Sequence, residues 1–330
     1  MISLIVIGHN EGWRLSKCLA SISQIVGDYK DLKFEVLYID SRSSDDSIER
    51  AKKFTDIKIY ELSGKMNAAI ARNIGAQEAG GDILFFIDGD MELQPDFLYH
   101  ALNEKGDLKY DALTGHLDDY FYDINGEFMA ASPRTYSNKI PDVVQNLKTN
   151  GGIFLIKKTI WCQLMGMNTK YKINEDIDLA IRLNRAGVCT QRLPYLITNH
   201  HTIDYRNEKR MWKMLWAGNG FYPGLLFRDH FFNQDVLKRA MRSEYTALLL
   251  FLFLLSFFVD QNIFMVAGAA YFFVLAIRAI IHTRKAKSKK NSIPYFFERF
   301  TFQILLDFSF WVGFMFFYPQ EIELKYKPLY

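Results

Sequence analysis

The sequence predicts an α/β domain built around a parallel sheet, followed by a region of strongly hydrophobic helices. Up to about residue 225, short apolar runs alternate with helical patterns and polar, Gly-containing turns, which is typical of a sheet with helices on its faces. After Ser243 the chain changes to long apolar runs that are almost free of charge. We therefore expect two domains, residues 1–225 and a membrane-associated helical region at 226–330.

The N-terminal part contains four expected strands and the three helices between them. Each strand is a short apolar run bounded by polar or Gly-containing turns: SLIVIG, FEVLYID, IKIYEL and DILFFID. The helices are NEGWRLSKCLASIS, SIERAKKF and the Ala-rich KMNAAIARNIGAQEAG. The last of these ends at Gly80-Gly81, a common signal for a helix C-terminus.

Composition limits the function classes that remain open. The 330 residues are 49% hydrophobic, enough for a large core, and the net charge of +3 is too small to indicate nucleic-acid binding. Cys18, Cys162 and Cys189 are widely spaced, so they predict neither a zinc site nor a disulfide framework and favour a reducing compartment. The N-terminal run MISLIVIGHN lacks the charged start of a signal peptide and is expected to be a strand.

Acidic and amide side chains follow the ends of several expected strands. Asn10 and Glu11 follow the first strand, Asp40 ends the second, and Asp88 and Asp90 follow the fourth. Ligands of parallel α/β sheets bind beyond the carboxyl ends of the strands, so these residues predict a binding site. The alternative at the fourth strand is an ordinary Asp-Gly turn.

A divalent cation is expected at this edge of the sheet. Neither G-x-G-x-x-G nor G-x-x-x-x-G-K-[ST] occurs, so the sequence lacks the usual backbone cradles for phosphate. Hard oxygen ligands such as those of Asp88 and Asp90 suit Mg²⁺ or Mn²⁺, which bridge carboxylates and substrate phosphates. The sequence therefore indicates that phosphates of a ligand are neutralised by a metal ion.

A second acidic group opens a later helix. In NEDIDLAIRLNRAG, Glu175, Asp176 and Asp178 lie at the helix start, where acids also complement the helix dipole. A purely structural capping role is therefore the alternative to a role in chemistry. Upstream, Gly151 and Gly152 open a further strand, TNGGIFLIKKTIW.

Three hydrophobic segments, at about 245–259, 263–281 and 300–318, predict contact with a membrane. A spanning helix needs about 20 apolar residues: the first segment is slightly short, the second is adequate, and the third, which carries Asp307, either spans or lies in the interface. The basic run RKAKSKK follows the second segment, so the positive-inside rule places it, and with it the N-terminal domain, in the cytoplasm. The alternative is a buried bundle of a soluble protein, but these runs offer no polar face to water.

Five segments of the chain, in a fixed order, match the motifs of one enzyme family. They are IGHNEGWRLSKCLASI, VLYIDSRSSDDSIERA, KMNAAIARNIGAQEAGGDILFFIDGDMEL, NGGIFLIKKTIW and NEDIDLAIRLNRAG, and together they cover roughly the first 190 residues. In these segments the chain resembles family 2 glycosyltransferases. The resemblance implies a GT-A fold, in which a Rossmann-like mixed sheet is flanked by helices. It also implies transfer of a sugar from a nucleoside-diphosphate donor with inversion at the anomeric carbon.

The resemblance also implies roles for individual residues. Glu11 and Asp40 match the acids that hold the base and ribose, and Asp176 matches the catalytic base. The donor-binding set implied is Asn10, Glu11, Asp40, Lys65, Arg72, Asp88, Gly152 and Glu175. The ligands implied for Mn²⁺ or Mg²⁺ are Asp88 and Asp90 of the D-x-D motif. Separately, the pair His200-His201 follows the strand YLIT, and His201 is predicted to be a third metal ligand. Contact with the diphosphate and a packing role are the alternatives for this pair.

Two departures from the family pattern refine the expectation. The Gly-Glu-Asp that often stands at the base motif is Asn174-Glu175-Asp176 here, which keeps both acids. Where processive synthases carry Q-x-x-R-W, this chain has RNEKRMWKMLW at Arg206–Trp216 without the Gln, which argues for addition of one or a few sugars. Its mixture of basic residues and tryptophans fits either an interfacial helix on anionic lipid or a partly buried helix.

The function expected is transfer of a sugar to a membrane-presented acceptor, such as a polyprenyl-linked sugar, in cell-surface polysaccharide or glycolipid assembly. The enzyme would sit at the cytoplasmic membrane with its catalytic domain facing the cytoplasm. Transfer directly to polyprenyl phosphate and a non-catalytic membrane scaffold are the alternatives, and a nucleotidyltransferase would need a Gly-rich phosphate loop that the sequence lacks. Residues from about 110 to 150 carry no pattern that names the sugar or the acceptor, and none indicates an oligomeric state.

Overall fold

The computed structural model describes residues 1–133, 142–149, 151–204, 208–285 and 292–329. The chain divides into two compact units: unit 1 comprises Met1–Tyr205 and Gln320–Tyr330, and unit 2 comprises Arg206–Pro319. The boundary predicted at residue 225 therefore falls inside unit 2, whose first described helix begins at Glu208. The C-terminal residues were expected in the membrane region but belong to unit 1, because they add a strand to its sheet.

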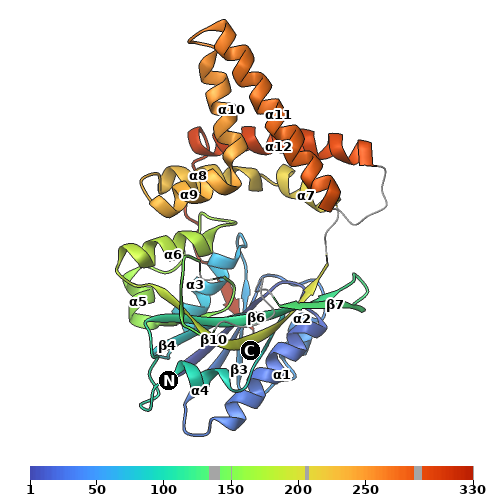
Figure 1. The fold of residues 1–330 in the computed structure, drawn as a ribbon. Helices are drawn as coiled ribbons and strands as arrows, with labels where there is room; N and C mark the ends of the chain where they lie inside the picture. Colours follow the sequence, from blue (N-terminus) through green and yellow to red (C-terminus); the bar gives the residue numbers. More distant parts are fainter. Residues whose placement is uncertain (134–141, 150, 205–207, 286–291, 330) are drawn as a thin grey trace. The chain divides into compact units, whose positions relative to one another are not determined.

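Unit 1 is built on a mixed β-sheet whose parallel half consists of the four predicted strands (Figure 1). In the described residues the main strand order is β11-β3-β2-β1-β4-β9-β6-β10-β5. The parallel strands are β1 (Ile2–Gly8), β2 (Phe34–Asp40), β3 (Ile57–Leu62) and β4 (Ile83–Asp88). Pairing of Gly8 with Asp40 and of Ile7 with Asp88 brings the carboxyl ends of β1, β2 and β4 to one edge.

The other half of the sheet mixes strand directions. β4 pairs antiparallel with β9 (Phe154–Lys157), and β6 (Ala112–Tyr122) pairs parallel with β10 (Thr190–Ile203). The remaining described strands are β5 (Met91–Leu93), β7 (Phe128–Pro133), β8 (Gln145–Leu147) and β11 (Tyr326–Pro328). β5 begins just after β4 and pairs with β10 through Met91 and His200, which brings β10 beside the carboxyl end of β4.

Helices cover both faces of this sheet. They are α1 (Trp13–Asp28), α2 (Ser47–Ala51), α3 (Ala68–Glu78), α4 (Phe97–Ala101), α5 (Lys158–Gln163) and α6 (Glu175–Arg185). Side chains of β1 alternate between two cores: Leu4 and Val6 pack in the core that contains α1, and Ile5 and Ile7 in the core that contains α3 and α6. The pleat produces this alternation, and burial on both faces explains why β1 is a continuous apolar run.

The C-terminal strand β11 covers the outer edge of β3. Tyr326 pairs with Leu62 and Pro328 with Tyr60, antiparallel to β3. The Tyr326 hydroxyl donates to Glu78 on α3 (2.5 Å), which fixes the strand to the neighbouring helix. An uncovered edge would present unpaired backbone groups, so β11 protects this side of the sheet from further strand pairing.

Unit 2 is helical throughout its described residues (Figure 1). Its elements are α7 (Glu208–Trp216), the 3₁₀ turn η1 (Asn219–Phe221), α8 (Tyr222–Asp229), α9 (Gln234–Ser243), α10 (Tyr245–Ser256), α11 (Gln261–Lys285) and α12 (Ser292–Met315). The hydrophobic segments predicted from the sequence fall on α10, α11 and α12. Most of the basic run RKAKSKK lies outside the described residues, as do Arg206 and Asn207 of the predicted interfacial segment.

Only α11 among the described helices is long and apolar enough to cross a membrane, over Gln261–Arg284. α10 is apolar and carries no charged residue, but its 12 residues extend about 18 Å, less than a hydrocarbon core of about 30 Å. α12 reaches 24 residues but carries three charged side chains, Glu298, Arg299 and Asp307.

A buried polar cluster joins α10, α11 and α12. Asp307 on α12 accepts hydrogen bonds from Thr246 Oγ1 on α10 (2.8 Å) and from the Tyr271 hydroxyl on α11 (3.0 Å). Gln303 donates to the same carboxylate (2.8 Å), and Arg278 donates to Thr246 Oγ1 (3.1 Å). Because an unpaired polar group in an apolar interior is costly, this cluster favours one packing arrangement of the three helices.

Candidate active site

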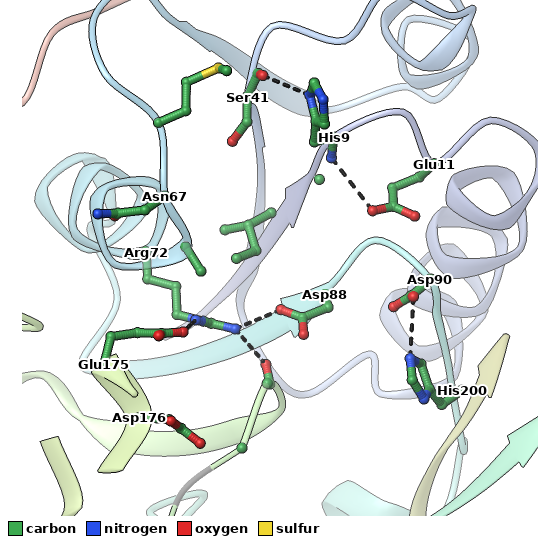
Figure 2. A pocket seen from close by; sticks show the side chains of 16 residues that line it. His9, Glu11, Ser41, Asn67, Arg72, Asp88, Asp90, Glu175, Asp176 and His200 are labelled. Carbon is green, nitrogen blue, oxygen red and sulfur yellow. Dashed lines mark hydrogen bonds and ion pairs between the residues drawn. The ribbon is translucent and has the colours of Figure 1, made fainter. Parts of the chain in front are cut away.

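A cavity of about 560 Å³ lies at the carboxyl ends of β1 and β4 (Figure 2). Seven of the residues predicted to form the site line it: Glu11, Arg72, Asp88, Asp90, Gly152, Glu175 and Asp176. They come from five different parts of unit 1, so the fold gathers side chains that are up to 165 positions apart in the sequence. The edge at which ligands of parallel sheets bind is thus the edge that holds the cavity.

Arg72 is the central cation of one wall. It projects from α3, is 2% exposed, and approaches Asp88 Oδ1 at 2.7 Å and Glu175 Oε1 at 3.6 Å (Figure 2). It also donates to the carbonyl of Gly152 (3.4 Å). Asn67 caps the start of α3 by accepting from the Ile70 N–H (2.8 Å), so the helix that carries Arg72 begins at the pocket itself.

Asp90 is held on the opposite wall by two other cationic side chains. His200 Nε2 lies 3.2 Å from Asp90 Oδ2, and Arg14 Nη1 lies 3.4 Å from the same oxygen. His200 Nδ1 in turn lies 2.6 Å from Asp119 Oδ1, because His200 and Asp119 are partners in the β10–β6 ladder. The carboxylates of Asp119 and Asp90 thus hold the His200 imidazole in place through both of its ring nitrogens.

The close carboxylates perturb one another. Burial, followed by repulsion from Asp90, raises the pKa of Glu11 to about 8, although Arg14 opposes the shift. Desolvation also raises the pKa of Asp88, against the effect of Arg72 and together with that of Asp90. Burial disfavours the charged form of His200, but its hydrogen bonds to Asp119 and Asp90 outweigh burial and raise its pKa to about 9. Such crowding of carboxylates favours positive charge in the cavity.

Gly152 gives Asp88 the room it occupies. A Cβ atom at this position would lie 1.9 Å from Asp88 Oδ2, far inside van der Waals contact. The neighbouring Gly151 has a φ of 68°, but a Cβ there would meet no atom within 4 Å. Glycine is therefore needed at 152 because the Asp88 side chain approaches it closely, and at 151 because the backbone there is left-handed.

The base motif opens α6 at the rim of the cavity. Asn174 takes a left-handed conformation (φ 68°), and Glu175 and Asp176 follow it in the first turn with both residues lining the cavity. Asp178 is 3% exposed and pairs with Arg182 (2.8 Å), whose guanidinium also donates to the carbonyls of Leu164 and Gly166. Asp178 therefore anchors the helix rather than lining the site.

Four residues predicted for the site do not line the cavity. The Asp40 carboxylate is fully buried and accepts from the Tyr38 hydroxyl and from the backbone and hydroxyl of Ser43, all at 2.6–2.7 Å. The Asn10 side chain accepts from the backbone N–H of Ser44 (2.7 Å), and Lys65 is likewise absent from the lining. Asp40 and Asn10 instead shape the loop after β2, whose Ser41 borders the cavity.

The third metal ligand predicted, His201, is the fourth of these residues. Its Nδ1 lies 2.9 Å from the Tyr122 hydroxyl and its Nε2 lies 2.7 Å from Glu92, so both ring nitrogens already have partners. Successive residues of a strand point to opposite faces, and it is His200 that faces Asp90. His200, His9, Ser41 and Asn67 line the cavity and were not in the predicted set.

The residues present can accept a divalent cation only with help from a ligand. Within the described part of the chain, no three His, Cys, Asp or Glu side chains converge to form a complete metal site. Asp88 and Asp90 nevertheless supply hard oxygen atoms in one cavity, and Mg²⁺ and Mn²⁺ commonly take their other ligands from substrate phosphates and water. The donor set therefore fits a metal that arrives together with a phosphorylated ligand.

The sequence model of the protein family Glycosyl transferase family 2 matches residues 3–162 of this chain. This stretch runs from β1 to β9 and contains both Asp88 and Asp90. Residues 3–162 are a family 2 glycosyltransferase domain. The resemblance seen in the sequence motifs is thereby confirmed, and the match ends before the acids of α6.

Named glycosyltransferases are among the relatives of this domain. Glycosyltransferase AglE of Haloferax volcanii is 27% identical over 121 residues, which span 36% of this chain and 39% of AglE. The amylovoran biosynthesis glycosyltransferase AmsB of Erwinia amylovora is 23% identical over 218 residues, 59% of this chain and 70% of AmsB. The match to AglE thus covers well under half of that protein.

Solved structures confirm the fold of the glycosyltransferase domain. S. aureus TarS 1–349 superposes with a TM-score of 0.52 at 14% identity, over 92% of this chain and 90% of that one. The same protein has been solved in complex with UDP-GlcNAc. At this identity the likeness concerns the fold, which is the GT-A-like mixed sheet predicted from the sequence.

Proposed function

We propose that the chain transfers a sugar from a nucleoside-diphosphate donor to an acceptor hydroxyl with inversion at the anomeric carbon. The observation that carries the proposal is the convergence of Asp88, Asp90, Arg72 and Asp176 in one cavity at the carboxyl edge of the sheet. A non-catalytic scaffold would have no chemical need to keep these four side chains together.

Asp176 is the proposed catalytic base. It takes the proton of the acceptor hydroxyl while the acceptor oxygen attacks the anomeric carbon from the face opposite the nucleotide. The bond from that carbon to the diphosphate oxygen breaks in the same displacement, and the nucleoside diphosphate leaves with the electron pair. One base suffices for this inversion, unlike the paired carboxylates of glycoside hydrolases.

The departing diphosphate gains negative charge, which the cavity is equipped to offset. Arg72 supplies a fixed cation in one wall of the cavity. Asp88 and Asp90 would hold Mn²⁺ or Mg²⁺, and a bound cation supplies Lewis-acid stabilisation of the leaving group. Glu11, Gly152 and Glu175 are proposed to contact the donor, together with His9 and Ser41 at the rim.

The acceptor proposed is presented by a membrane. Among the described helices of unit 2, α11 is able to span a bilayer, and the unit exposes many large apolar side chains, which suits an acceptor such as a polyprenyl-linked sugar. The role proposed, in cell-surface polysaccharide or glycolipid assembly from the cytoplasmic face, agrees with the name of AmsB, an amylovoran biosynthesis glycosyltransferase. Transfer directly to polyprenyl phosphate is the second candidate.

The first test is donor binding and hydrolysis by the purified full chain in detergent, with Mn²⁺ or with a chelator. The panel of nucleotide sugars begins with UDP-GlcNAc, the sugar nucleotide in the TarS complex. We expect metal-dependent release of one nucleoside diphosphate. Absence of binding to every donor by a folded sample would overturn the proposal and favour the scaffold.

Substitution of the base provides the second test. Asp176→Asn is expected to abolish transfer while leaving donor binding largely intact, because the base acts on the acceptor. Asp46→Asn makes the same chemical change at an exposed residue outside the cavity and serves as the matched control. Near-full turnover by Asp176→Asn would show that another group is the base.

A further inference from the structure

We propose that the segment Phe231–Ser243, the turn after α8 together with α9, lies on anionic lipid headgroups and inserts Phe232 among them. This segment is called the α9 surface below. The inference rests on the membrane association proposed for unit 2. It adds the element that meets the membrane surface and the charge of the lipid that it contacts.

Two aromatic side chains are exposed in the turn that precedes α9. Phe232 is 93% exposed and Phe231 43%, with ring centroids 5.4 Å apart. The turn is held at both ends: His230 is buried, and the Asn233 side chain caps α9 by accepting from two backbone N–H groups. A phenyl ring so exposed leaves apolar area in water that a lipid interface would bury.

α9 itself carries the positive charge that an anionic surface attracts. Lys238, Arg239 and Arg242 are all exposed, and Lys238 and Arg242 are neighbours one turn apart on the same face. Met241 beside them is 60% exposed, and Asp235 is the one acidic residue of the α9 surface. Exposed basic residues combined with exposed apolar ones are typical of helices that lie in a membrane interface.

The position of α9 within unit 2 supports the same partner. Its C-terminus is tied to the apolar hairpin of α10 and α11, because Arg278 on α11 donates to the carbonyl of Ser243 (3.1 Å). The far end of the hairpin exposes Phe257–Val259, with Phe258 82% exposed, and its turn is completed by Asp260, Gln261 and Asn262. α9 lies at the opposite end of the hairpin from Phe257–Val259 (Figure 1). If the hairpin inserts into the hydrocarbon with Phe257–Val259 first, its other end stays near the membrane surface. α9, which is attached to that end, would then lie at the lipid headgroups.

An acidic protein would also attract the three cations of the α9 surface. The exposed phenyl pair, and the continuity with a hairpin that exposes Phe257, Phe258 and Val259 near its turn, favour lipid over such a partner. If the α9 surface contacts lipid, the side chain at position 232 should be in contact with anionic lipid but not with neutral lipid, and no second protein should be needed.

The experiment places a fluorescent probe at this position in the full chain. Phe232→Cys is labelled with an NBD maleimide after Cys162 and Cys189 are replaced by Ser, since the third thiol, Cys18, is fully buried. The protein is embedded in nanodiscs of phosphatidylcholine alone or with phosphatidylglycerol, which contain lipids spin-labelled at shallow or deep positions. We expect quenching by the shallow label, and only when the anionic lipid is present.

Two reference positions separate this inference from the proposal on which it rests. A probe at Phe258→Cys reports insertion of the hairpin and should be quenched by the deep label in both lipid mixtures. A probe at Met165→Cys, which is 90% exposed in unit 1, should not be quenched. Quenching at 258 without quenching at 232 would overturn the α9 surface alone, and loss of quenching at both would overturn membrane insertion as well.

Charge removal tests the role of the basic residues. The triple variant Lys238→Gln, Arg239→Gln, Arg242→Gln should lower the ratio of docked to undocked α9 on the order of 100-fold, which abolishes quenching at 232. The control removes three exposed lysines of unit 1, Lys30, Lys33 and Lys52, by the same change. Equal quenching in the two triple variants, or in neutral and anionic nanodiscs, would show that headgroup charge plays no part.

Discussion

Replacement of Gly152 by Ala should disable the site without unfolding the protein. The new Cβ atom would lie 1.9 Å from Asp88 Oδ2, and reaching the 3.4 Å of ordinary contact requires the carboxylate to move by roughly 1.5 Å. Asp88 is one-third exposed, so its side chain can swing into the cavity at little cost in stability. It then leaves the 2.7 Å contact with Arg72 and the position from which it would hold a metal.

A misplacement of about 1 Å in catalytic geometry typically costs on the order of 100-fold in rate, so we expect at least that loss in transfer. Nucleoside diphosphate release by the full chain, measured together with Mn²⁺-dependent donor affinity and thermal unfolding, tests this. Gly151→Ala is the matched control: it strains a left-handed backbone by about 1 kcal/mol but adds no atom near Asp88. If Gly152→Ala retained activity within threefold of the wild type, Asp88 would not need the position that it occupies in the structure.

Three further perturbations test the framework around the site. Arg72→Met leaves Asp88 and Glu175 without their shared cation, so we expect a loss of about 3 kcal/mol in the free energy of unfolding by denaturant. The control Arg50→Met removes the cation of an exposed ion pair and should change this free energy little. Equal losses in the two variants would refute the role of Arg72 as the cation that stabilises the two carboxylates. The pKa of Glu35 is lowered, because hydrogen bonds from Ser3, Lys58 and Gly80 outweigh its burial. Its carboxylate therefore stabilises the fold above about pH 4.5 and loses that effect as the pH falls through the folded pKa. Glu35→Gln should cost about 1 kcal/mol at neutral pH and progressively less below pH 4.5, whereas a pH-independent difference in unfolding free energy would contradict this reasoning. Deletion of residues 320–330 uncovers the edge of β3 and should cause self-association visible by light scattering; a monodisperse truncated chain of unchanged stability would show that β11 is dispensable.

Part of the site could be predicted because some of its residues directly follow or open a strand or helix that the sequence pattern identifies. Asp88 and Asp90 follow an apolar run whose length and flanking turns identify it as a strand, and the edge at which it ends is set by the parallel topology. Asp176 opens a helix with a clear apolar periodicity. Pattern and position therefore suffice to bring these three carboxylates to one cavity.

Other residues depend on side-chain direction and strand register, which the sequence does not encode locally. Asp40 ends a strand like Asp88, but Tyr38 and Ser43 satisfy its carboxylate inside the loop. His200 and His201 are adjacent and chemically identical, and only the pairing of His200 with Met91 of β5 decides which imidazole faces Asp90.

The C-terminal strand lacks a local signal altogether. β11 is three residues long and contains Pro328, and its partner strand lies more than 260 positions earlier in the sequence. A short strand of this kind is defined by the open edge that it covers, so it cannot be recognised until the sheet is known.

The return of β11 to unit 1 makes unit 2 an insertion in the glycosyltransferase unit, and this has a consequence for biosynthesis. The ribosome completes β1–β10 first, then all of α7–α12, and only afterwards the strand that covers β3. During that interval unit 1 carries an open sheet edge while the apolar helices are already available to a bilayer. A chain that stalls within unit 2 would therefore keep the edge of β3 open to pairing with strands of other chains.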